Sequence, residues 1–238
     1  MVLSEEEFAK RREKMVQSLI QGGVLRTQKC IRSMMTVKRH LFVWSGHEEH
    51  AYYDHPLPLG NTGQTISAPH MCAYMIEALN LEVGGTILEI GTGSGYHAAL
   101  LAECVAPTNV AKERWGMVIT IEYVEELYHL AKENLRRAGY SDRVSCLVGD
   151  GTLGVPPSEE RELYDRVLVT AGAPSPPKPL LRQLKKGGMM VIPVGGRFYQ
   201  QLERIVKLDE DRYETSTLMG CLFVPLLGQY GWREGGDR

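Results

Sequence analysis

A glycine-rich turn with an acidic residue beside it is the first feature of this 238-residue chain that indicates ligand binding. In LEIGTGSGY (88–96), Gly91, Gly93 and Gly95 directly follow an apolar run, and Glu89 stands two residues before Gly91. Glycines at such a turn let the backbone pass close to a ligand at the carboxyl end of a strand. A tight strand-to-helix turn without a ligand has the same pattern, so the turn alone decides nothing.

The turn differs from a dinucleotide-binding fingerprint. That fingerprint reads GxGxxG, and its last glycine allows close packing of strand and helix beside a pyrophosphate; here Tyr96 stands at that position. The carboxylate of Glu89 would repel a pyrophosphate, but it suits a ligand with an ammonium or sulfonium group. The residues therefore favour a positively charged ligand without phosphate.

Two more acidic residues follow predicted strands. Glu122 ends VITIE (118–122), where a carboxylate can accept both hydroxyls of a ribose. Asp150 stands between two glycines in GDG (149–151), where it can accept the amino group of an adenine. Any one of the three acids also fits a solvated turn. Their recurrence at three strand ends predicts S-adenosyl-L-methionine as the cofactor and S-adenosyl-L-homocysteine as its product.

The elements that position these turns alternate along the chain. Short apolar runs predict strands at residues 86–90, 118–121, 144–148, 165–170 and 189–194. A helical apolar stripe covers 125–138, and Gly139 is a natural end for it. This alternation predicts an α/β fold with a doubly wound, mainly parallel sheet. Residues 202–208 and 217–226 predict an antiparallel pair of strands at the sheet edge.

The N-terminal region is predicted to be helical. Ser4 and Glu7 form a capping box that starts a first helix, and residues 28–35 predict a second, short one. We expect residues 1–60 to be a helical extension packed on the core, and residues 61–238 to form one compact domain.

A loop carrying hydroxyl groups precedes the glycine turn. In GNTGQTISAPHM (60–71), Ser67 comes just before a helical pattern that begins at Ala68, with Pro69 in the first turn. Its hydroxyl is placed either to cap that helix or to orient a bound carboxylate. The prolines and glycines of residues 52–63 predict a loop with no regular element.

Composition and charge exclude several classes of protein. The formal net charge of −2 gives no field that recruits nucleic acid, and no apolar run approaches the roughly 18 residues that span a membrane. Five scattered cysteines predict reduced thiols and a cytoplasmic protein. HEEH (47–50) lacks the spacing of a zinc helix, so no metal is predicted. A monomer is the default expectation.

Six stretches resemble the protein-L-isoaspartate(D-aspartate) O-methyltransferase family. They are GQTISAPHM (63–71), LEIGTGSGY (88–96), VGDG (148–151), YDRVLVTAGAP (164–174), LKKGGMMVIPVG (184–195) and FVPLLGQYGW (223–232). The glycine turn is shared by many methyltransferases, whereas GQTISAPHM is specific to this family. The tail resembles archaeal members. The stretch CVAPTNVAKERWGMVITIE (104–122), between the helix after the glycine turn and the second strand, is longer than the resemblance leads us to expect.

The resemblance implies a class I, Rossmann-like methyltransferase fold. It implies methyl transfer to the α-carboxyl of L-isoaspartyl residues, with D-aspartyl residues left open, in damaged proteins and peptides; the ester then collapses to a succinimide. The implied catalytic residue is Ser67, and the implied substrate-binding residues are Thr65, His70 and Val224, the last on a strand ending FVPL. The implied cofactor-binding residues are Glu89, Gly91, Thr92, Gly93, Glu122, Asp150 and Gly151.

Two other functions share the cofactor evidence. A methyltransferase acting on tRNA or a small molecule would use the same turns but leaves GQTISAPHM unexplained. A non-catalytic module that binds S-adenosyl-L-methionine is the second alternative, and only an assay separates it from an enzyme.

Overall fold

A mixed sheet organises the chain, and the computed structural model describes residues 3–155 and 162–233. Within these residues, the seven strands of this sheet lie in the order β5-β4-β3-β6-β7-β8-β9. The strands are β3 (Thr86–Ile90), β4 (Met117–Glu122), β5 (Val144–Val148), β6 (Tyr164–Val169), β7 (Leu184–Gly196), β8 (Tyr199–Asp209) and β9 (Arg212–Cys221). Strands β3 to β7 pair in parallel, and β8 and β9 are antiparallel. The predicted fold class is confirmed.

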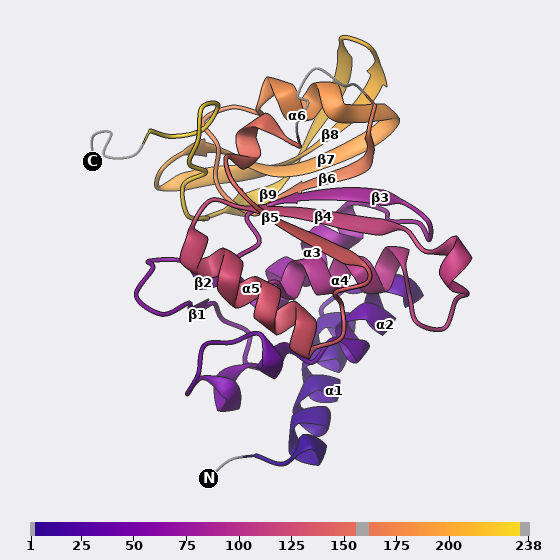
Figure 1. Ribbon diagram of the computed structural model, residues 1–238, viewed down its shortest axis with the longest axis vertical. Coiled ribbons are helices and arrows are strands. Elements are labelled where there is room, and N and C mark those ends of the chain that lie inside the picture. Colours follow the sequence, from indigo (N-terminus) through magenta and orange to yellow (C-terminus); the bar gives the residue numbers. More distant parts are fainter. Residues whose placement is uncertain (1–2, 156–161, 234–238) are drawn as a thin grey trace.

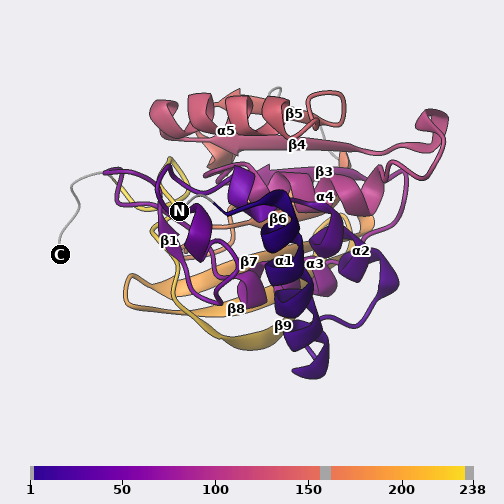
Figure 2. The ribbon, with the colours of Figure 1, turned by 90° about the horizontal axis from the view of Figure 1, so that it is seen from below.

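Helices cover the sheet unequally. Figure 1 shows α2 to α5 below the sheet and α6 above it, and Figure 2 shows α1 and α2 outside α3 and α4. The α-helices are α1 (Glu5–Gln21), α2 (Gln28–Thr36), α3 (Pro69–Ala78), α4 (Tyr96–Val105), α5 (Glu125–Arg137) and α6 (Lys178–Gln183). The short 3-10 turns are η1 (Arg39–Leu41), η2 (Glu48–His50), η3 (Lys112–Arg114) and η4 (Gly151–Leu153).

The predicted N-terminal helices are present and share a core with the sheet. The capping box that starts α1 is formed, with the amide of Glu7 donating to Ser4 Oγ at 3.2 Å. Helix α4 is buried along its whole length because α2 covers the side that faces away from the sheet. Phe8 and Leu19 of α1 belong to the same apolar cluster as Leu100 of α4. The boundary at residue 60 stays a prediction.

Two local predictions were wrong. Residues 52–63 are not entirely irregular, because β1 (Leu57–Pro58) pairs with β2 (Thr65–Ile66). No strand ends in FVPL, because β9 stops at Cys221. Beyond it the amide of Phe223 donates to the Gln200 side chain at 2.8 Å. The chain thus leaves the sheet edge there and crosses toward the carboxyl ends of the parallel strands.

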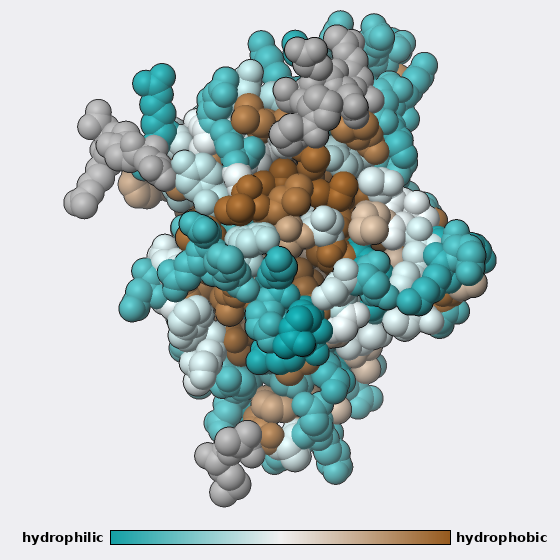
Figure 3. Space-filling model, in the orientation of Figure 1, coloured by the Kyte–Doolittle hydropathy of each residue, from teal (hydrophilic) through white to brown (hydrophobic). Residues whose placement is uncertain are grey.

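Strand β5 forms one edge of the sheet, and its outer side chains reach the surface. Figure 3 shows apolar side chains across the middle of the molecule, where β4 and β5 lie. Met117, Leu147 and Val148 of these strands are between 36% and 50% exposed. Helix α6 packs on β7, whereas β5 is contacted by α5. Among the described helices, none is long and apolar enough to cross a membrane.

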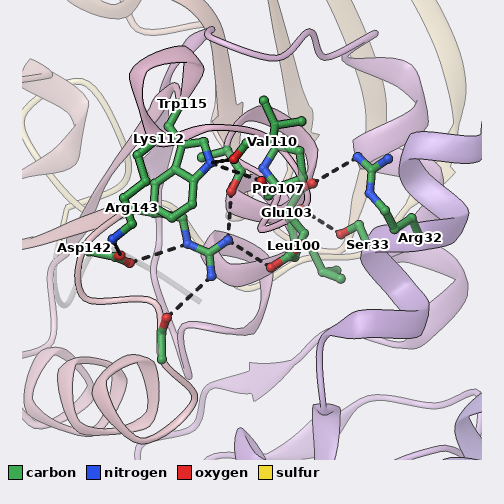
Figure 4. Close-up of polar contacts among 12 residues, drawn as sticks. Arg32, Ser33, Leu100, Glu103, Pro107, Val110, Lys112, Trp115, Asp142 and Arg143 are labelled. Atoms are coloured by element: carbon green, nitrogen blue, oxygen red, sulfur yellow. Dashed lines mark hydrogen bonds and ion pairs between the residues drawn. The ribbon is translucent and has the colours of Figure 1, made fainter.

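The longer connection before β4 covers a buried ion pair (Figure 4). Arg143 Nη1 lies 3.0 Å from Glu103 Oε1, and both side chains are at most 4% exposed. The Trp115 ring stacks against the Arg143 guanidinium at 5.1 Å. Its Nε1 donates to two carbonyls of its own segment, at 3.0 and 2.9 Å. Residues 106–116 therefore shield the pair from water.

Removing one member of this pair should destabilise the fold. Glu103→Leu removes the buried partner of Arg143 and leaves only the half-exposed Asp142, 3.5 Å from Arg143 Nε, so we expect the free energy of unfolding to fall by about 3–5 kcal/mol. The double variant Glu103→Leu/Arg143→Leu should recover part of that loss because no charge stays buried. Denaturant unfolding of the three proteins measures both effects. A single variant as stable as the parent chain would show that the pair does not hold this region together.

Candidate functional site

An open cleft lies at the carboxyl ends of the parallel strands, where the order along the sheet turns back at β3. It contains about 820 Å³ of space, open solvent at its mouth included. The predicted site residues in its lining are Thr65, Ser67, Gly91, Thr92, Gly93, Glu122, Gly151 and Val224. The predicted site residues outside its lining are Glu89, Asp150 and His70.

Two glycines make the floor of the cleft close-fitting. Gly91 has φ +91°, and a Cβ there would lie 2.4 Å from Thr170 Oγ1. A Cβ on Gly151 would lie 2.5 Å from a methyl carbon of Ile90. Neither position accommodates a side chain without a shift of its neighbours. A flat ligand can therefore approach the backbone closely at both strand ends.

Glu122 joins two of the turns that line the cleft. Its Oε2 accepts the amide of Gly93 at 2.7 Å, and its Oε1 accepts the amide of Val124 at 3.0 Å. The side chain is thus fixed at the end of β4 and lines the cleft. Each oxygen keeps acceptor capacity, which suits a pair of ribose hydroxyls.

Glu89 lies beneath the lining and connects to it through hydroxyl groups. Its Oε2 accepts from Thr120 Oγ1 at 2.6 Å. Thr120 Oγ1 in turn lies 2.7 Å from Thr92 Oγ1. Glu89 Oε1 has no hydrogen-bond partner in the described part of the chain. Burial, with a smaller contribution from the nearby Glu122 charge, raises the pKa of Glu89 to about 8, although the Thr120 hydrogen bond lowers it. The carboxyl is therefore mostly protonated at pH 7.

Asp150 lies beside the cleft and holds the C-terminal segment. Its Oδ1 accepts from the amide and hydroxyl of Thr152 at 2.9 and 2.6 Å, and its Oδ2 accepts from the amide of Gln229 at 2.7 Å. A carboxylate offers about four acceptor positions, so one remains for an adenine amino group. The contact with Gln229 also fixes Leu226 and Leu227 in the lining.

The structure excludes one of the two roles open to Ser67. Helix α3 has Ala68 as its N-cap and no side-chain capping bond, so the predicted serine cap is wrong. The helix starts at Pro69, one residue too late for Ser67 to cap it. No hydrogen bond of the Ser67 hydroxyl to another described residue is found, and Ser67 lines the cleft. The hydroxyl is therefore available to a ligand.

Of the other three predicted substrate residues, two line the cleft and one does not. Thr65 and Val224 line the cleft together with Ser67, and Val224 comes from the segment after β9. His70 lies outside, where its Nδ1 and its amide both contact Asp54 Oδ1 at 2.9 Å. His70 thus ties the start of α3 to the preceding loop, and any contact with a substrate stays a prediction.

Several lining residues were not foreseen: Gln64, Cys72, Ser94, Tyr96, His97, Tyr123, Thr170, Leu226 and Leu227. Thr170 follows β6 directly, so the strand-end rule that found Glu122 also applies to it. Tyr96 and His97 begin the helix after the glycine turn, which is a second usable signal. Cys72 carries no such signal because only the packing of α3 brings it to the cleft.

The acceptor groups and glycines of the cleft fit the predicted cofactor. The glycine floor, Glu122 and the free position on Asp150 match a nucleoside, and Glu89 has a buried oxygen without a partner. Among residues 3–155 and 162–233, no three His, Cys, Asp or Glu side chains are grouped to hold a metal ion.

Comparisons with known proteins agree on one family. A family model described as protein-L-isoaspartate(D-aspartate) O-methyltransferase matches residues 10–231. A protein-L-isoaspartate O-methyltransferase from Hyperthermus butylicus is 50% identical over 230 residues, which are 97% of this chain and 94% of that protein. Its counterpart from Staphylothermus marinus is 48% identical over 227 residues, covering 95% and 98%.

A solved structure gives the same result. A protein-L-isoaspartate O-methyltransferase from Plasmodium falciparum, in complex with S-adenosyl-L-homocysteine, aligns with a TM-score of 0.77 at 25% identity. The alignment covers 91% of this chain and 98% of that one.

The raised pKa of Glu89 predicts a proton linkage. An ammonium group bound in the cleft stabilises the carboxylate, so binding of S-adenosyl-L-homocysteine at pH 7 should release up to about one proton. The release should vanish well above pH 8, since the pKa of about 8 leaves Glu89 already ionised there. Calorimetry in two buffers with different ionisation enthalpies gives the number of protons. Glu89→Gln should abolish the release and the remote Glu82→Gln should keep it; equal release from both variants contradicts the assignment.

Proposed function

The chain belongs to the protein-L-isoaspartate(D-aspartate) O-methyltransferase family, and we propose that residues of the cleft at its strand ends transfer a methyl group from S-adenosyl-L-methionine to the α-carboxyl of L-isoaspartyl residues in damaged proteins. One observation supports the proposal that this reaction takes place in the cleft. The glycine turn and the unbonded Ser67 hydroxyl line the same cleft. A loop that bound only the cofactor would not need a free hydroxyl on the opposite wall.

The acceptor needs alignment rather than activation. A carboxyl group has an ordinary pKa near 4, so it is already a nucleophile at neutral pH and requires no general base. The Ser67 hydroxyl can donate to one carboxylate oxygen and leave the other free to attack. Fixed geometry of this kind can lower a barrier by several kcal/mol, up to roughly 7–11.

The opposite wall receives the cofactor. When bound, S-adenosyl-L-methionine supplies a methyl group on a positively charged sulfur. Glu122 accepts the ribose hydroxyls, and Asp150 accepts the adenine amino group through its remaining position. Ile90, Leu226 and Leu227 add apolar side chains to the lining of the cleft.

The methyl ester explains the repair of the damaged residue. The neighbouring backbone nitrogen attacks the ester carbonyl and expels methanol, which leaves a succinimide. Water then opens the succinimide to aspartate or again to isoaspartate. The partners are therefore damaged proteins and peptides. Its five free cysteines favour the reducing cytoplasm as the compartment.

Isomeric peptides test the proposed substrate. A peptide containing isoaspartate should accept methyl groups from labelled S-adenosyl-L-methionine, and the same peptide with aspartate should not at any similar rate. The two differ only in where the free carboxylate lies along the backbone, so a pocket with fixed geometry can separate them. Equal methylation of both peptides contradicts the proposal. Inactivity on both combined with methylation of tRNA favours the alternative acceptor.

Substitution of Ser67 tests its role. Ser67→Ala should slow single-turnover methyl transfer by roughly ten- to a hundredfold, because one positioning hydrogen bond of about 1–3 kcal/mol is lost. The free energy of unfolding and the affinity for S-adenosyl-L-homocysteine should change little, since the hydroxyl caps no helix. Ser145→Ala, on β5 away from the cleft, is the control. A wild-type single-turnover rate in Ser67→Ala would leave only the loop backbone to orient the acceptor.

A further inference from the structure

Arg39 is a buried cation directly behind the loop that carries Ser67. It begins η1, and its side chain is 0% exposed. Its Nε donates to the carbonyl of Ala51 and its Nη2 to the carbonyl of Ser67, both at 2.8 Å. Its Nη1 has no hydrogen-bond partner in the described part of the chain. The guanidinium thus keeps one donor nitrogen unused in the interior of the protein.

No described carboxylate forms an ion pair with Arg39. The contrast is Arg143, the other deeply buried arginine, which pairs with Glu103 at 3.0 Å. Besides the two carbonyls, Arg39 contacts the face of the Tyr96 ring, at 4.8 Å from Cζ to the centroid. An unpaired charge in a low-dielectric interior is costly unless something compensates it. A bound anion would supply that compensation.

The groups between Arg39 and the cleft are neutral. Cys72 and His97 line the cleft close to the guanidinium, and His97 Nε2 lies 3.3 Å from the Cys72 carbonyl. Burial raises the pKa of the Cys72 thiol to about 11 and lowers the pKa of His97 to about 4. Neither side chain therefore offsets the positive charge at pH 7.

Two acids of this region, whose charges act on Cys72, are already engaged. Asp54 contacts His70 near the surface, and Glu89 lies under the cofactor wall, where it is mostly protonated at pH 7 because its pKa is raised to about 8. The field of Arg39 consequently reaches the Ser67 side of the cleft with little opposition.

We propose that Arg39 is a positioning residue for the acceptor: its buried charge draws the substrate carboxylate to the Ser67 side of the cleft, and its hydrogen bond to the Ser67 carbonyl fixes the loop that presents the hydroxyl. This role rests on the proposed function, because it takes the group beside Ser67 to be a carboxylate. Binding of the substrate then supplies the negative charge that the interior lacks.

The charge of Arg39 also acts on the cofactor. S-adenosyl-L-methionine and S-adenosyl-L-homocysteine differ in the methyl group and in the positive charge on sulfur. A nearby cation disfavours the first relative to the second. The ratio of their two dissociation constants therefore reports the electrostatic potential at the sulfur, and a loosened loop that affects both ligands alike leaves the ratio unchanged.

Three variants separate charge from structure. Arg39→Met removes the charge, Arg39→Lys keeps it, and Arg32→Met removes a partly buried arginine of α2 that lies far from the cleft and contacts the Glu103 carbonyl. Arg39→Met should raise the KM for the isoaspartyl peptide by about tenfold or more, the scale of a lost buried charge contact. It should also lower the dissociation constant of S-adenosyl-L-methionine relative to that of S-adenosyl-L-homocysteine. Arg39→Lys should keep the wild-type ratio, and Arg32→Met should change neither quantity.

A measurement on the unmodified protein covers the case in which Arg39→Met does not fold. An isoaspartyl peptide whose α-carboxyl is replaced by a neutral carboxamide should bind about tenfold more weakly than the carboxylate peptide in the presence of S-adenosyl-L-homocysteine. Equal binding of the two peptides overturns the proposal. So does a folded Arg39→Met protein with wild-type KM and ratio, or an Arg39→Lys protein whose ratio matches that of Arg39→Met. Failure of the unmodified protein to methylate any isoaspartyl peptide overturns the proposed function instead.

Discussion

The cofactor wall of the site depends on the hydrogen bonds of one carboxylate. Glu122 accepts the amide of Gly93 from the turn after β3 and the amide of Val124 from the turn after β4. Adjacent parallel strands bring the two turns to the same edge of the sheet, but pairing ends with the strands. The Glu122 side chain holds the two turns together beyond the last paired residues of the strands. Gly91 and Gly151 then only leave room for the ligand, because they have no side chains.

The acceptor wall depends on the N-terminal helices instead. The Ser67 carbonyl is held by Arg39 of η1, and the start of α3 is held through Asp54 and His70. These contacts come from residues before the sheet begins, and the same region shares the apolar core with α4. The extension is therefore part of the site, and removing it would remove the positioning of the acceptor loop.

The sequence was informative where a short-range rule decides the structure. Strand ends, the glycine turn and Glu122 follow from periodicity and from where parallel strands finish, so they were predictable. Ser67 was ambiguous because a shift of one residue in the helix start decides between a cap and a free hydroxyl. Arg39 was not predictable as a site residue: in VKRHLFV it stands among other basic residues, and only tertiary packing buries it without an acid.

The two walls of the cleft favour ligands of opposite charge, and the reaction changes the charges of those ligands. Glu89 and Glu122 favour a positive ligand on one side, and Arg39 favours a negative one on the other. Methyl transfer turns the sulfonium into a neutral thioether and the carboxylate into a neutral ester. The acceptor thereby loses the charge that drew it to the cleft, whereas the cofactor product keeps its ammonium group, and Arg39 again lacks a compensating partner. An arrangement that attracts the acceptor carboxylate consequently favours release of the methyl ester, because the unpaired charge of Arg39 that stabilises the substrate complex no longer stabilises the ester complex.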